Sequence, residues 1–102
     1  MTNTVNVQFQ GFHPSEFTLA YVDRMLAKIQ DRAPHGSVLR ATFSRQKDLI
    51  VATLRVVSGV GDYFAIARGR RLRHAGRRLT AQITRRMERN PRGKRHGYRQ
   101  SA

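Results

Sequence analysis

The sequence predicts an α+β domain with two layers, in which a four-stranded mixed sheet carries two helices on one face. Apolar residues alternate with a period of two in four short segments and recur at three- and four-residue spacing in two longer ones. The resulting order is β-α-β-β-β-α. The chain has 102 residues, which is enough for one hydrophobic core. With one core, both helices bury their apolar sides on the same face of the sheet.

The first strand and the first helix are predicted at the start of the chain. Apolar and polar residues alternate over residues 4–9, which is typical of a half-buried strand. Ser15 is a favourable N-cap residue, and Glu16 then lies in the first turn of the helix, where a carboxylate is stabilising. The helix ends before Pro34. Its expected apolar arc consists of Leu19, Val22, Met25, Leu26 and Ile29.

Three further strands follow the first helix. Residues 38–44 and 49–57 each place alternate apolar side chains on one face, and the polar segment 46–48 forms the turn between them. The glycine-rich segment 58–62 is typical of a hairpin turn, and it leads into a short strand at residues 63–67. The helical connection makes the first two strands parallel, whereas the short turns make the later pairs antiparallel.

The second helix is predicted over about residues 70–90. Its apolar residues fall within about 120° of arc at the 100° per residue of an α-helix. They are Leu72, Ala75, Gly76, Leu79, Ile83 and Met87. Asn90 and Pro91 end the helix. We therefore expect a folded domain over residues 1–90 and a mobile basic tail over residues 91–102, which have no apolar periodicity.

Charge is the dominant feature of the composition. The formal net charge is +14, and 17 of the 20 basic residues are arginine. Residues 1–67 hold seven basic and five acidic side chains, whereas residues 68–102 hold thirteen basic and one acidic. Such a block of one sign is typical of a protein that binds a polyanion. The chain has no cysteine and no apolar run of membrane-spanning length, and its first residues have neither the basic nor the apolar region of a signal peptide, so we expect a cytoplasmic protein without a disulfide framework.

Four arginines of the second helix are predicted to lie on one side of it, opposite the apolar residues. They are Arg71, Arg78, Arg85 and Arg89, and they project within about 40° of one another. Like charges at this spacing repel, and a bound polyanion removes that repulsion. The planar fork of arginine pairs well with phosphate. A solvated face that only keeps the protein in solution is the alternative, but the scarcity of acidic residues favours nucleic-acid binding.

No constellation of residues indicates catalysis. The four histidines are His13, His35, His74 and His96, and no pair of them has metal-ligand spacing on one predicted element. The carboxylates form no pair for acid–base chemistry, and no glycine-rich phosphate loop is present. We therefore expect a binding protein rather than an enzyme, with no cofactor, no metal site and no small-molecule substrate.

Two segments resemble a known family, the short ribosome hibernation promoting factors, also called ribosome-associated inhibitor A or sigma-54 modulation proteins. Leu26-Ala27-Lys28-Ile29 resembles the family's apolar-Ala-Lys-Leu segment in the first helix. Ile83-Thr84-Arg85-Arg86-Met87 resembles its Leu-x-Arg-Gln-Leu segment in the second, with Arg89 where the family usually has Lys. The resemblance covers about residues 4–90. The family's Asp-Met-Tyr-x-Ala-Ile-Asp signature falls on residues 71–77, where only Ala75 is kept.

The resemblance implies a function without catalysis. Members bind ribosomal RNA of the small subunit, of the 16S type, in the channel for mRNA and tRNA, and they inhibit translation while the ribosome rests. The contact role passes to Lys28, Arg85 and Arg89, and the charge pattern adds Arg24, Arg71, Arg78 and Arg92. We expect no membrane partner and a monomer when the protein is off the ribosome. A nonspecific RNA- or DNA-binding protein, such as a nucleoid protein or an RNA chaperone, remains the alternative, because both depend on phosphate attraction.

Overall fold

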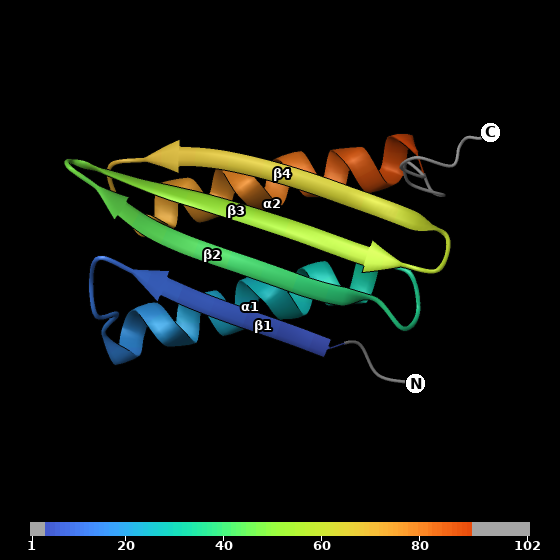
Figure 1. Cartoon of the computed structure of the whole chain (residues 1–102), viewed down its shortest axis with the longest axis horizontal. Helices are drawn as coiled ribbons and strands as arrows, with labels where there is room; N and C mark the ends of the chain where they lie inside the picture. Colours follow the sequence, from blue (N-terminus) through green and yellow to red (C-terminus); the bar gives the residue numbers. More distant parts are fainter. Residues whose placement is uncertain (1–3, 91–102) are drawn as a thin grey trace.

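The computed structural model describes residues 4–90 and contains the predicted two-layer α+β fold (Figure 1). The elements are β1 (Thr4–Gln10), α1 (Glu16–Arg32), β2 (Val38–Gln46), β3 (Leu49–Ser58), β4 (Gly61–Gly69) and α2 (Leu72–Arg89). The strands lie in the order β1-β2-β3-β4, with β1 and β2 parallel and the other two pairs antiparallel. Both helices cover the same face of the sheet. The predicted tail at residues 91–102 lies outside the described residues.

One face of the sheet and the apolar sides of both helices enclose the core. Burial alternates along β3 and β4, so every second side chain points toward the helices. Phe43 of β2, Leu54 of β3 and Ile83 of α2 have no exposed surface and belong to one cluster. These observations confirm the apolar faces predicted for residues 38–44 and 49–57 and the apolar stripe of the second helix.

The prediction that Leu19 belongs to the buried arc of α1 is wrong. Leu19 is 41% exposed, whereas Val22, one turn further along, is 1% exposed. In Figure 1 the first turns of α1 extend beyond the edge strand β1, so the sheet does not cover them. Helical spacing predicts which side of a helix faces a core, but it does not predict where along its length the core begins.

The two helices begin in different ways. Ser15 caps α1 as predicted, since its side-chain oxygen accepts a hydrogen bond from the backbone N–H of Thr18 at 3.1 Å. Arg71 occupies the cap position of α2 without any side-chain capping bond, and the first turn of α2 holds no acidic residue. The positive end of the α2 helix dipole therefore lies beside cationic side chains, an arrangement that an external anion would stabilise.

The last strand is longer than predicted. The sequence predicted a strand at residues 63–67, but β4 runs from Gly61 to Gly69 because its backbone pairs with β3 along its whole length, from Ser58↔Gly61 to Ile50↔Gly69. Backbone hydrogen bonds between strands do not depend on the polarity of the side chains. The start of α2 approaches the end of β4 closely. A Cβ at Gly69 would lie 2.7 Å from the backbone nitrogen of Ala75, so glycine is the residue that fits at this position.

The helices approach each other closely at Gly76 of α2. A Cβ there would lie 2.9 Å from the Tyr21 hydroxyl and 3.0 Å from the Met25 sulfur, both on α1. Tyr21 also donates a hydrogen bond to the carbonyl of Arg73 at 3.3 Å, which ties α1 to the first turn of α2. The missing side chain at Gly76 therefore sets the spacing between the two helices.

We expect Gly76→Val to lower the free energy of unfolding by about 1–3 kcal/mol because the added methyl groups overfill this contact. Valine is a better helix former than glycine, so a loss of stability must come from crowding. The matched control is Ala81→Val, at an exposed position of the same helix. Urea denaturation of both variants measures the effect, and equal stability of the two would contradict a close contact at Gly76.

Candidate nucleic-acid interface

Arginines on and before α2 dominate the surface on the helix side of the molecule. All eight of them are exposed: Arg70, Arg71, Arg73, Arg77, Arg78, Arg85, Arg86 and Arg89. Glu88 is the one acidic residue of α2, and it forms an ion pair with Arg32 of α1 at 3.0 Å. Within residues 4–90 the other ion pair joins Arg55 and Asp62 in the sheet. The arginines of α2 are therefore not neutralised by carboxylates of the described chain.

A groove between the two helices brings together cations from both of them. Its volume is about 340 Å³, and its lining includes Arg24 and Lys28 of α1 and Arg77 of α2. Arg24 and Lys28 were predicted as site residues, whereas Arg77 was not. The sequence places Arg77 between the apolar stripe and the predicted arginine row, and only the packing of α1 against α2 shows that it lines the same groove as Lys28.

The predicted arginine row does not form one continuous surface with this groove. Arg78 follows Arg77 directly but turns to the other side of α2, where its guanidinium donates to the backbone carbonyl of Arg68 on β4 at 2.8 Å. Arg85 and Arg89 lie together beside Arg86, around a shallow hollow of about 150 Å³. The helix side thus presents two groups of cations, one toward α1 and one along the far side of α2.

The start of α2 adds a third group of cations. Arg71 is the cap residue, and its backbone carbonyl accepts hydrogen bonds from the N–H groups of His74 and Ala75. The guanidinium of Arg73, which was not among the predicted site residues, lies 5.8 Å from the centre of the Tyr21 ring. This contact holds Arg73 against α1 while its charge stays exposed. Arg92, the remaining predicted site residue, lies outside the described residues.

The exposed groups on this surface are chemically suited to phosphate. Exposed guanidinium groups offer paired donors to phosphate oxygens, and the one carboxylate of α2, Glu88, is paired with Arg32 of α1. Across residues 4–90, no cluster of three or more His, Asp or Glu side chains is placed to hold a metal ion. No helix within these residues is both long enough and apolar enough to cross a membrane.

Comparison with solved structures shows the same fold in two other proteins. A ribosomal subunit interface protein from Coxiella burnetii matches with a TM-score of 0.74 and 12% identity, over 86% of this chain and 97% of that one. The N-terminal domain of Protein Y from Thermus thermophilus matches with a TM-score of 0.62 and 16% identity, over 80% of this chain and 97% of that one. No family model and no curated protein matches the sequence. The resemblance noted in the sequence is therefore confirmed at the level of the fold.

Proposed function

We propose that this protein binds the small ribosomal subunit through phosphates of ribosomal RNA, in the channel for mRNA and tRNA, and inhibits translation there. The observation that carries the proposal is an exposed, unneutralised arginine surface on a fold that a ribosomal subunit interface protein shares. Ribosomal RNA is a shaped polyanion, and arginines carried on a preformed helix meet it without ordering of the backbone. The protein then acts in the cytoplasm, by occupancy and without catalysis.

The contacts fall on the three groups of cations. Arg24 and Lys28 contact RNA from α1, and Arg77 of α2 contacts it beside them because it lines the same groove. Along α2 and beyond it, the contact residues are Arg71, Arg73, Arg78, Arg85, Arg89 and Arg92. Because these groups point in different directions around the helices, they suit a concave RNA channel better than a single straight duplex.

Competition binding separates this proposal from nonspecific nucleic-acid binding. We expect the protein to bind assembled small subunits at least about tenfold more tightly than protein-free ribosomal RNA or duplex DNA, because only the assembled subunit presents phosphates in a fixed shape. If six to eight phosphates are contacted, the affinity falls about a thousandfold between about 50 and about 200 mM salt. Co-sedimentation with labelled protein measures both effects. Equal affinity for all three competitors would favour a nucleoid protein or an RNA chaperone.

A further inference from the structure

The face of the sheet away from the helices carries side chains that no part of the described chain covers. Figure 1 shows both helices behind the sheet and this face open. The strand registers align four of its residues in one row across the sheet: Asn6, Arg40, Arg55 and Phe64. Neighbouring strands lie about 4.8 Å apart, so the row is about 14 Å long. This length equals the width of other four-stranded sheets, on which two or three bases stack.

Arg40, near the centre of this face, is a cation without a neutralising partner. It lies directly opposite Arg55 in the antiparallel pair of β2 and β3. Like charges in this position destabilise a sheet. Arg55 is paired with Asp62 at 3.6 Å, and within residues 4–90 no ion pair neutralises Arg40. A phosphate bound at Arg40 would remove this repulsion.

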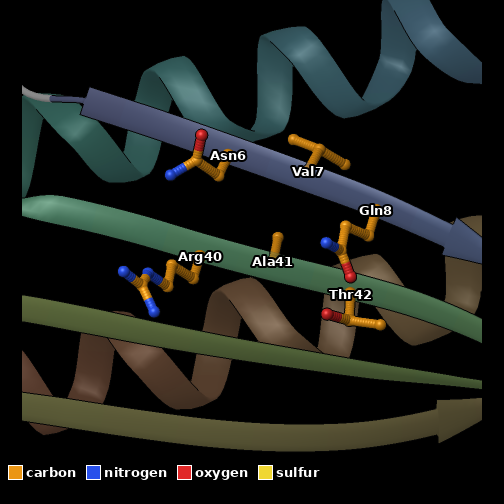
Figure 2. Close-up of a pocket in the computed structure, with 6 residues that line it drawn as sticks. All are labelled: Asn6, Val7, Gln8, Arg40, Ala41 and Thr42. Atoms are coloured by element: carbon orange, nitrogen blue, oxygen red, sulfur yellow. The ribbon is translucent and has the colours of Figure 1, made fainter.

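Beside Arg40 the sheet is hollowed and lined by amides. The hollow, of about 410 Å³, lies between β1 and β2, and Asn6, Gln8 and Thr42 contribute to its lining together with Arg40 (Figure 2). Carboxamide groups both donate and accept hydrogen bonds, as the edges of nucleobases require. The same hollow therefore offers a charge for phosphate and polar groups for a base.

An exposed aromatic ring completes the row. Phe64 of β4 is 51% exposed and Ile66, two residues further along the same face, is 36% exposed. A half-exposed phenylalanine on an open sheet offers a flat surface on which an unpaired base can stack. Two arginines, Arg40 and Arg55, lie side by side on this face, whereas charged residues are depleted at the centre of protein–protein interfaces.

We propose that the open face of the sheet binds single-stranded RNA, with a base stacked on Phe64, a phosphate at Arg40 and a base edge at Asn6 and Gln8. This site lies on the opposite side of the sheet from the arginines of α2, so the protein has two separate RNA-binding faces. The choice of RNA over DNA rests on the proposed function, whereas the recognition of unpaired bases rests on this face alone.

The test compares an adenine octaribonucleotide with the same strand made abasic at its central positions, by fluorescence anisotropy. Both probes carry the same charge, so the ratio of their dissociation constants reports base contacts and cancels nonspecific attraction. We expect the full chain to bind the intact strand about tenfold more tightly. Phe64→Ser should reduce this ratio to about one, and Phe64→Tyr should keep it. Arg40→Gln should weaken binding of both probes several-fold and lower the salt slope by about 0.7.

Phe17→Ser is the matched control, because it removes an exposed phenylalanine (84% exposed) from α1 instead of from the sheet. It should leave the ratio unchanged. A wild-type ratio near one, a ratio that survives Phe64→Ser in a folded variant, or a ratio lost in Phe17→Ser or Phe64→Tyr would each overturn the proposal. Because this assay contains no ribosomes, a protein that keeps the ratio but does not bind small subunits would refute the proposed function and leave the sheet site standing.

Discussion

Leu54→Asp and Ile83→Asp should each leave the domain unfolded at room temperature. Both side chains are fully buried, Leu54 from the sheet and Ile83 from α2, so aspartate at either position has no water and no cation beside it in the core. An unpaired buried charge costs several kcal/mol, and the lost apolar packing adds to that cost. The total stability of a small domain is only about 5–15 kcal/mol.

Circular dichroism during thermal denaturation measures this effect. Leu49→Asp is the matched control for the strand, since it makes the same substitution on β3 at a residue that is 39% exposed. Ala81→Asp serves the same purpose for α2, where Ala81 is exposed. Both controls should melt cooperatively within several degrees of the wild type. Cooperative melting of either core variant near the wild-type temperature would be inconsistent with a single core between sheet and helices.

Replacing the predicted arginine row by glutamine should abolish inhibition of translation almost completely. The variant carries Arg71→Gln, Arg78→Gln, Arg85→Gln and Arg89→Gln, and all four positions are exposed. Glutamine is a good helix former, so the fold should be retained. The loss of four phosphate contacts held in a fixed geometry should weaken binding by at least about a hundredfold at physiological salt.

A second variant removes the same number of charges from the end of the chain: Arg92→Gln, Lys94→Gln, Arg95→Gln and Arg99→Gln. Its net charge equals that of the first variant. We expect it to bind several-fold more weakly than the wild type and still to inhibit, as measured in a cell-free translation assay. Equal loss of inhibition in the two variants would show that only the net charge matters and would favour nonspecific binding. Failure of this second variant alone would place the essential contacts beyond Pro91.

The order of elements and the identity of the core residues were predictable because they follow from local periodicity. Alternation in the strands and the three- and four-residue spacing in α2 depend only on the geometry of the chain, and nearly all the residues chosen in this way are buried. The N-cap at Ser15 was predictable for the same reason, because capping is a contact over three residues. The concentration of positive charge in the last third of the chain was also visible without any structure.

The tertiary structure alone decided how these charges are divided between surfaces. A helical projection shows the angle between Arg77 and Arg78, but not that α1 packs on one side of α2 and β4 on the other. The exposure of Leu19 depends likewise on where the sheet ends beneath α1. The row from Asn6 to Phe64 joins four strands through pairing between residues distant in sequence. Sequence thus determined which side of each strand and helix faces the core and how much charge the protein carries, whereas packing between distant segments determined which charges and rings share a surface.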